Sequence, residues 1–326
     1  GVDSGTACGL WLEDAKSTIL TDVTISGVGG PTSGIPLQAC GLHAAGGNFL
    51  EATSLEITDV LASGDHPAWG ARIEAETNPV FSSLHVQGVS GVGAFGLDLA
   101  SPLNQANVVG LHVTDVISVA TDEDAAAGDA VGVEVDSVNN QLFALTLRGL
   151  WVSGIAATPK ISSEGAAVEG VARGLRVQLP GLLTIHGAAF TDIESLESVE
   201  GTSGAVEILE ADSATLAHLT AHHIQGPGPI DDNPSFGLLA SGPVSSGIEI
   251  HSSIFSGIHG PALVANDEAT VSVDHSLFAT PTNDAPPEEE SWLTVGDGVL
   301  TSETAAFLSD EDIHLDASSV GIDAGR

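Results

Sequence analysis

Residues 145–155 read Leu145-Thr146-Leu147-Arg148-Gly149-Leu150-Trp151-Val152-Ser153-Gly154-Ile155. Apolar residues alternate with other residues in two short runs, which are separated by two spacers and followed by a Ser-Gly pair. Alternation with a period of two indicates short β-strands that each bury one face. The spacers and the Ser-Gly pair indicate corners, because Gly and Ser favour turns. This stretch therefore predicts two consecutive strands of a coil.

The same signature recurs along the chain. Further copies begin at Leu20, Leu55, Leu111, Ile248 and Val271, and a Thr-Asp pair replaces Ser-Gly in some of them. A second kind of short alternating strand precedes the copies. It starts at Gly9, Gly41, Gly70, Gly96, Gly132 and Gly174, with weaker versions at Ala205, Gly237 and Ala262. Successive starts lie about 25 to about 42 residues apart, which is the range of one solenoid coil with a variable loop.

These repeats predict an all-β, right-handed parallel β-helix of about nine or ten coils, with residues 1–326 forming a single domain. Three short strands per coil would stack on their counterparts about 4.8 Å away and fill the interior with Val, Ile and Leu. A doubly wound α/β fold is excluded, because the connecting segments are rich in Gly, Pro, Ser and Asp instead of forming amphipathic helices. We expect irregular loops on one side of the solenoid, at Val119–Val131, Ala156–Arg173, Gly226–Phe236 and Thr280–Ser291.

The chain is strongly acidic. It has 44 Asp and Glu residues against 7 Lys and Arg residues, which gives a formal net charge of −37. Such a surface repels nucleic-acid phosphates and anionic lipid headgroups, so we expect neither as a partner. No apolar run approaches the roughly 20 residues that a membrane span needs, so we expect no membrane insertion. The chain opens on Gly1 without a signal peptide, and we interpret it as a segment trimmed from a longer precursor.

The 2 cysteines of the chain follow the repeat. Cys8 and Cys40 each stand directly before a Gly-Leu strand start in successive coils. The repeat therefore places them one coil apart, near the Cα separation of about 5–6 Å that a disulfide prefers. We predict a Cys8–Cys40 disulfide in preference to metal binding. A disulfide implies an oxidising compartment, so the sequence predicts secretion or display at the cell surface.

The C-terminal segment carries a family resemblance. Asp312-Ile313-His314-Leu315, followed by Ser319-Val320-Gly321-Ile322-Asp323-Ala324-Gly325, resembles the closing motif of bacterial surface β-helix proteins, in which D-x-H-L precedes S-P-x-I-D-x-G. Val320 replaces the usual Pro. Through its repeats the whole chain resembles the pectate-lyase-like superfamily of right-handed parallel β-helices. The resemblance implies the fold but no single activity, since this superfold hosts lyases, hydrolases, adhesins and inert stalks.

Stacking the Gly-headed strands aligns outward side chains in one column. Its members are Trp11, His43, Arg72, Asp98, Glu134, Arg176 and Glu207. One interpretation is a charge ladder, in which each pair contributes roughly a few tenths of a kcal/mol. The other is a shallow ligand-binding face, because enzymes of the resembled superfamily carry their clefts on this sheet. Asp98 and Glu134 are the catalytic candidates, since stacked carboxylates lie about 5 Å apart, as in a retaining glycosidase. However, any two acidic residues stacked in a parallel ladder acquire this spacing, so the spacing alone does not indicate catalysis.

Two groups of residues are candidates for metal binding. Glu56, His85 and His112 fall in one column of a later strand, next to Trp151, and imidazole and carboxylate groups bind transition metals. Calcium is the one cofactor that the acidic loops suggest, with candidate ligands at Asp122, Asp124, Asp231 and Asp232. No EF-hand or Gly-Gly-x-Gly-x-Asp repeat occurs, so solvated acidic loops are the simpler interpretation.

Three functions are open. No nucleophile elbow, phosphate loop, zinc-type Cys pair or dinucleotide fingerprint occurs in a suitable context, so nothing demands an enzyme. The leading hypothesis is a non-enzymatic extracellular or cell-surface solenoid whose acidic face adheres to a glycan, a surface protein or matrix. The alternative is a carbohydrate-active β-helix, a glycoside hydrolase more than a polysaccharide lyase, because a polyuronate cleft would need many cations. The third is end-to-end association into an extracellular filament, for which residues 292–295 are relevant.

Overall fold

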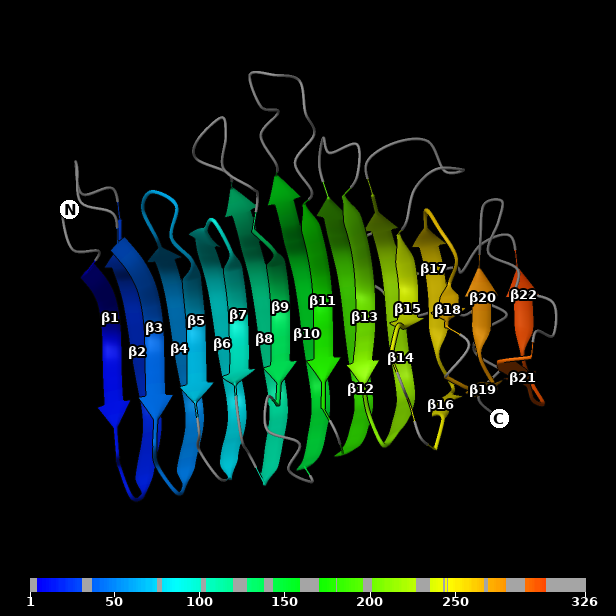
Figure 1. Ribbon diagram of the computed structural model, residues 1–326, viewed down its shortest axis with the longest axis horizontal. Coiled ribbons are helices and arrows are strands. Elements are labelled where there is room, and N and C mark those ends of the chain that lie inside the picture. The colour runs from blue at the N-terminus through cyan, green and yellow to red at the C-terminus, as the bar shows by residue number, and fades with distance from the viewer. Residues whose placement is uncertain are drawn as a thin grey trace.

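The computed structural model describes residues 5–30, 37–74, 78–100, 104–119, 128–137, 143–158, 170–179, 181–195, 201–226, 235–242, 244, 246–266, 269–279 and 291–302. Every regular element within these residues is a β-strand. Each ladder between two strands is parallel, and successive coils stack along one axis (Figure 1). No helix that could cross a membrane occurs in the described part of the chain.

Two sheets run the length of the molecule. Sheet A lies in front in Figure 1 and has 9 strands in the order β1-β3-β5-β7-β9-β11-β13-β15-β18. Its strands are β1 (Gly5–Glu13), β3 (Leu37–Ala45), β5 (Ala68–Glu74), β7 (Ala94–Ala100), β9 (Ala130–Asp136), β11 (Val171–Gln178), β13 (Thr202–Glu210), β15 (Phe236–Ala240) and β18 (Leu263–Ala265).

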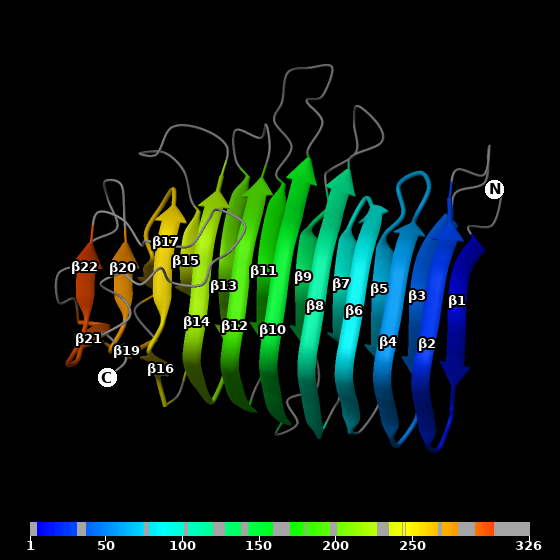
Figure 2. The same ribbon diagram turned by 180° about the vertical axis from the view of Figure 1, so that it is seen from behind.

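Sheet B lies in front in Figure 2 and has 13 strands. Its longer strands are β2 (Thr18–Gly29), β4 (Leu50–Leu61), β6 (Pro79–Gly91), β8 (Gln105–Val119), β10 (Phe143–Thr158), β12 (Gly181–Ser195) and β14 (Ser213–Gln225). Its shorter strands are β16 (Ile248–His251), β17 (Ile254–Ile258), β19 (Val271–Asp274), β20 (Leu277–Ala279), β21 (Leu293–Val295) and β22 (Leu300–Ser302). The two sheets form the all-β parallel β-helix that the repeats predict.

Sheet B differs from the predicted three short strands per coil. From β2 to β14 the second and third predicted strands form one long strand that bends at residues with positive φ. The first bend holds Asp22, Ser54, Ser83, Gly110, Gly149, Gly187, His218, Ser252, His275 and Gly298; the second holds Gly27, Asp59, Gly88, Asp115, Gly154, Asp192, His223 and Gly257. One left-handed residue redirects the backbone while the ladder continues on both sides. After β14 the bent strand separates into pairs such as β16 and β17.

Three of the four predicted insertions join sheet B to sheet A. These three lie between β8 and β9, β10 and β11, and β14 and β15, whereas the fourth lies between β20 and β21, which both belong to sheet B. The first three therefore follow the second bend, as predicted, although most residues of all four insertions lie outside the described ones. The closing motif of residues 312–325 also lies outside them.

The Gly at the start of the sheet A strands faces the interior. A Cβ on Gly70 would lie 2.3 Å from Cγ1 of Val86 in sheet B, and one on Gly174 would lie 2.5 Å from Cδ1 of Phe190. The next residue also faces the core, as Ala71 shows by its 0% exposure. Because the Gly and the residue after it both face the interior, the strict in–out alternation of side chains is interrupted there. The residue before each Gly therefore faces outward, as does the second residue after it. Sheet A therefore presents two outward columns on the two sides of the Gly.

Candidate functional site

The central column of sheet A contains the seven side chains that the sequence predicts. The ladder pairs Trp11 with His43, Arg72 with Asp98, and Glu134 with Arg176, and its members run in unbroken register from Trp11 to Glu207. They face away from the interior but are mostly covered: Asp98 is 7% exposed and Glu207 is 9% exposed. Adjacent members cover one another, because stacked parallel strands lie only about 4.8 Å apart.

Arg72 is shared between two carboxylates. Its Nη2 lies 2.6 Å from Oε1 of Glu74, and its Nε lies 3.4 Å from Oδ2 of Asp98. The Asp98 contact is an ion pair without hydrogen-bond geometry, and Arg72 Nε has no hydrogen-bond partner among the described residues. The guanidinium also lies 4.5 Å from the ring centroid of Trp69, the residue before Gly70. Arg72 is thus held by one partly exposed carboxylate, one buried carboxylate and one ring.

Arg176, three coils further along, is also held by two carboxylates. Its Nε donates to both carboxylate oxygens of Glu134, at 2.7 and 3.0 Å, and its Nη1 donates to Oδ2 of Asp129 at 2.5 Å. The side chains of Arg176 and Glu134 are 19% and 14% exposed, so the pair is largely withdrawn from water. Charge-assisted bonds of this kind are among the strong ones in proteins.

Burial shifts the ionisation of both catalytic candidates. Desolvation raises the pKa of Asp98 to about 6, against the opposing effect of Arg72. Desolvation likewise raises the pKa of Glu134 to about 7, although Arg176 opposes it. The two residues are ladder partners, as predicted, and the charge of Asp98 adds to the shift of Glu134. Adjacent carboxyls near neutrality can exchange protons with a ligand, a property that clusters at functional sites.

The sequence reasoning missed a second outward column, which we call the flanking column. It consists of the residues before the Gly: Cys8, Cys40, Trp69, Phe95, Val131 and Arg173, continued by Gly204 and Phe236. Trp69 and Phe95 stack with ring centroids 6.2 Å apart. The recurrent Gly could have indicated this column. Where a Gly and the residue after it both face the interior, the residue before the Gly must face outward.

Arg173 is the most buried cation of this face. It is 5% exposed, its Nε donates to Oε2 of Glu207 at 2.8 Å, and its guanidinium lies 4.7 Å from the ring centroid of Phe236. Further donors reach Thr202 O, Thr202 Oγ1 and Ala172 O. Glu207 is the ladder neighbour of Arg176, as predicted, but its carboxylate accepts from Arg173 of the flanking column.

The aromatic end of the central column is open to solvent. Trp11 is 51% exposed and stacks on His43 with ring centroids 4.0 Å apart. Burial holds the pKa of His43 below its usual range, so the imidazole is neutral at neutral pH. The face thus offers an exposed indole at one end and ion pairs along its middle.

The two cysteines are ladder partners, but they are free thiols. Sγ of Cys8 donates to Leu10 O at 3.2 Å, and Sγ of Cys40 donates to Leu42 O at 3.0 Å. The prediction of their proximity is correct, and the predicted disulfide is not formed in the structure. The two thiols nevertheless interact, since a side-chain hydrogen bond to Cys40 lowers the pKa of Cys8.

The predicted transition-metal residues are also ladder partners. Glu56 pairs with His85, and His85 with His112. The two imidazoles lie edge to face at 89°, with centroids 4.8 Å apart. Within the described residues, no group of three or more His, Cys, Asp or Glu side chains could hold a metal ion. The calcium candidates Asp122, Asp124, Asp231 and Asp232 lie outside the described residues.

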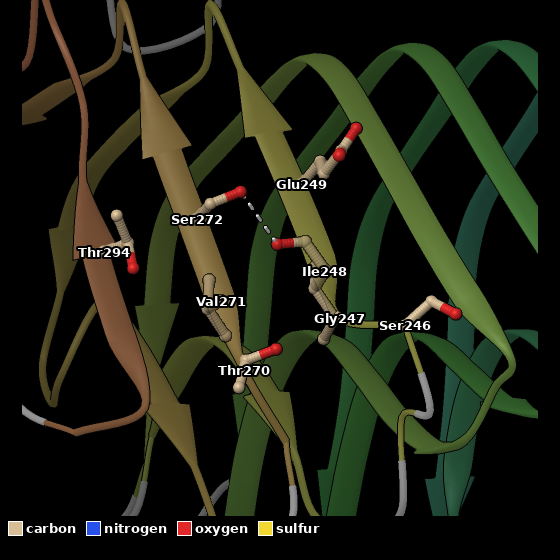
Figure 3. A pocket seen from close by; sticks show the side chains of 8 residues that line it. All are labelled: Ser246, Gly247, Ile248, Glu249, Thr270, Val271, Ser272 and Thr294. Carbon is tan, nitrogen blue, oxygen red and sulfur yellow. Dashed lines mark hydrogen bonds between the residues drawn. The ribbon is translucent and has the colours of Figure 1, made fainter.

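Sheet B carries a second, more open polar patch near its C-terminal end. A shallow pocket of about 120 Å³ is lined by the hydroxyls of Ser246, Thr270, Ser272 and Thr294 and by Glu249 (Figure 3). Beside it, His251 Nδ1 lies 2.8 Å from Asp274 Oδ1 and its Nε2 lies 3.6 Å from Glu249 Oε2. These groups are well hydrated, since the His251 and Glu249 side chains are 38% and 62% exposed.

Comparison with protein families, with curated proteins and with solved structures found no match in any of the three. The function must therefore be inferred from the site itself.

Proposed function

We propose that the protein is a non-enzymatic extracellular or cell-surface solenoid that adheres to an uncharged glycan through the outer face of sheet A. The observation that carries this proposal is the unbroken column from Trp11 to Glu207, in which an exposed ring and buried Arg–carboxylate pairs share one face. Planar guanidinium and carboxylate groups present paired donors and acceptors to adjacent hydroxyls, and an exposed indole offers a surface for the apolar side of a sugar.

The ionic groups of this face are better explained by binding than by stability. Buried ion pairs are weak contributors to stability, because desolvation offsets their attraction. The raised pKa values of Asp98 and Glu134 mean that burying their charged forms is unfavourable. Residues that lower stability in this way are retained most readily where they serve a function. The net charge of −37 disfavours an anionic ligand.

Glycoside hydrolysis is the second candidate, and the neighbouring carboxyls Asp98 and Glu134 favour it. With pKa values of about 6 and about 7, they could supply a base and an acid near neutral pH. A general acid must offer its proton to the glycosidic oxygen, however, and both carboxylate oxygens of Glu134 already accept from Arg176 Nε. This geometry favours binding over turnover.

End-to-end association remains a further proposal, supported by the first coil. Leu10 and Leu12 are only partly buried, whereas their ladder partners Leu42 and Ala44 are 0% and 1% exposed. At the other end, residues 293–295 form a strand that continues sheet B, as this hypothesis requires. Both ends therefore present strands with one unpaired edge in the described structure.

The test is a screen of neutral glycans for binding and for release of reducing ends, with and without Ca²⁺. We expect binding without turnover, and a loss of about tenfold in affinity for Trp11→Ala, since exposed aromatic anchors commonly contribute this much. The matched control is Ile19→Ala, which removes another exposed apolar side chain of the first coil, 66% exposed, from sheet B.

Two results would contradict the proposal. Release of reducing ends that disappears in both Asp98→Asn and Glu134→Gln would establish the hydrolase instead. Equal loss of affinity in Trp11→Ala and Ile19→Ala would show that sheet A is not the binding face.

A further inference from the structure

The central column of sheet A changes character at its C-terminal end. Its last two members are Leu239 and Val264. Beside them the face is hollowed into a pocket of about 270 Å³, whose apolar walls are Phe236, Leu239, Pro261 and Val264. An apolar cavity of about 150 Å³ holds a benzene ring, so this pocket has room for a larger aromatic side chain. The column therefore ends at an apolar pocket, whereas it begins with the exposed ring of Trp11.

The central column is complementary to its own reverse. It has one member on each strand of the 9-stranded sheet, and Glu134 is the fifth. Reversing the order brings the two rings of one end to the apolar members of the other, and each arginine to an acid. The resulting pairs are Trp11 with Val264, His43 with Leu239, Arg72 with Glu207, Asp98 with Arg176, and Glu134 with itself. The charged residues on either side of Glu134 thus form only attractive pairs.

A twofold axis parallel to the strands produces this reversal. If the axis passes in front of Glu134, it places the outer face of a second copy against the first, with the coil order inverted and each column opposite itself. The strands of sheet A lie nearly parallel across the sheet, so the two faces could meet along their whole length (Figure 1).

The face is large enough for a stable dimer. The 9 strands, about 4.8 Å apart, span about 38 Å, and the strands of 7 residues make the face about 20 Å wide. These dimensions give about 750 Å² on each copy and about 1,500 Å² in total, which is the usual size of a specific protein–protein interface.

The few cations of the chain gather on this face. The chain has 7 Lys and Arg residues, and Arg72, Arg173 and Arg176 all lie on sheet A. Two copies with a net charge of −37 repel each other, and the repulsion is weakest where each copy presents its cations. Arg72 contacts Trp69 and Glu207 contacts Arg173, so both turn toward the flanking column and stay on the same side after reversal.

We propose that a second copy of this chain covers the outer face of sheet A in a twofold-symmetric dimer, in which Trp11 of each copy enters the Phe236 pocket of the other. Burying an exposed indole in an apolar pocket is favourable, and such aromatic anchors dominate many interfaces. At the centre, burial raises the pKa of Glu134 to about 7, so one of the two facing carboxyls can keep its proton and donate it to the other in a hydrogen bond.

This inference does not rest on glycan binding. A second copy and a glycan would cover the same face and therefore compete for it, so pairing is measured without glycan. The dimer also differs from end-to-end association, because a twofold face-to-face pair is closed and adds no third copy.

The experiment is sedimentation equilibrium of the full chain in the micromolar range, in about 0.5 M NaCl to screen the long-range repulsion. We expect a closed dimer for the wild type. Trp11→Glu and Val264→Arg should each weaken pairing at least about tenfold, because each places a charge in an apolar contact. The double variant should regain most of the affinity, since the two new charges face each other across the interface. Within one chain the two positions lie at opposite ends of the column, so no contact inside a monomer can produce this recovery.

The matched controls are Ile19→Glu and Leu182→Arg, which add the same charges at positions of sheet B that are 66% and 51% exposed. They should leave pairing unchanged. The inference is overturned if the wild type is monomeric, if an open-ended series of oligomers forms, if the double variant pairs no better than the single variants, or if the controls weaken pairing equally. A monomer that binds a glycan would overturn the dimer alone, and a dimer that binds none would leave only the adhesion proposal refuted.

Discussion

The outer faces of sheets A and B are both formed by stacked parallel strands, yet their charged side chains differ in solvent exposure. On sheet A, Asp98, Arg173 and Glu207 are less than one tenth exposed and are held in ion pairs. On sheet B, Arg148 is exposed, and the His223 side chain, paired with Asp192, is 51% exposed. The inward Gly explains part of the difference, because it gives sheet A a flanking column on which arginines can lie over rings. The same repeat thus produces a face on sheet A whose ion pairs are largely shielded from water, which we call the dry face, and a face on sheet B whose charged groups are hydrated.

The largest expected effect comes from removing an arginine from the dry face. Arg176→Met should lower the free energy of unfolding by about 3–5 kcal/mol at pH 9, where Glu134 is ionised beside Arg176, because the substitution leaves this buried carboxylate without its partner. Arg148→Met, the matched change on sheet B, should alter it by less than about 0.5 kcal/mol, since Arg148 is exposed. Urea denaturation of both variants measures the two values. Similar losses in both would remove the distinction between the faces.

A smaller effect concerns the pH dependence of stability. The pKa of Glu134 is raised to about 7 in the folded protein, so the folded state keeps a proton that the unfolded state releases near pH 4.5. Stability from this group is therefore fully present below about pH 4 and is lost as pH rises to about 7, by about 3 kcal/mol in all. Glu134→Gln stays neutral while retaining an acceptor for Arg176, so it should lose much less stability over this range.

The measurement for Glu134 is denaturation of the wild type and Glu134→Gln at intervals from pH 4 to pH 8. The variant should be increasingly favoured over the wild type as pH rises. If the wild type were instead increasingly favoured, Arg176 would outweigh burial and the pKa of Glu134 would be lowered.

The smallest effect on stability is expected from His251 of sheet B, which is a basic group, whereas Glu134 is acidic. A hydrogen bond to Asp274 raises the pKa of His251, with Glu249 adding to the shift and burial opposing it. His275 also contacts Asp274. A raised histidine pKa gives stability that is present below about pH 6.5 and is lost as pH rises through the folded value.

Because His251 is 38% exposed, solvent screening limits this contribution to about a few tenths of a kcal/mol. His251→Gln should therefore reduce stability slightly at pH 5 and have no effect at pH 9. Denaturation at these two pH values, with NMR titration of the imidazole, checks both parts. A loss at pH 9 as large as at pH 5 would mean that packing, and not charge, accounts for the change.

Much of the fold and of the central column could be predicted because both depend on spacing. Once Gly70, Gly96 and Gly132 are aligned, Arg72, Asp98 and Glu134 must stack, and the structure has this register. The bonds of Arg173 could not be predicted in this way. Its partner Glu207 belongs to a different column, and only a side chain that crosses between columns connects them.

The cysteines illustrate the same limit. Ladder position brought Cys8 and Cys40 together, but both are free thiols in this structure, and each donates to a carbonyl of its own strand.

The sequence by itself determined the stacking of coils, because a period of two and a recurrent Gly leave one arrangement that buries the apolar residues of every coil. Only the tertiary structure decided which outward charges are dry, which pair, and where the face opens into the pocket at Phe236. These properties depend on contacts between side chains of neighbouring coils, and ladder position alone does not specify the direction of a long side chain.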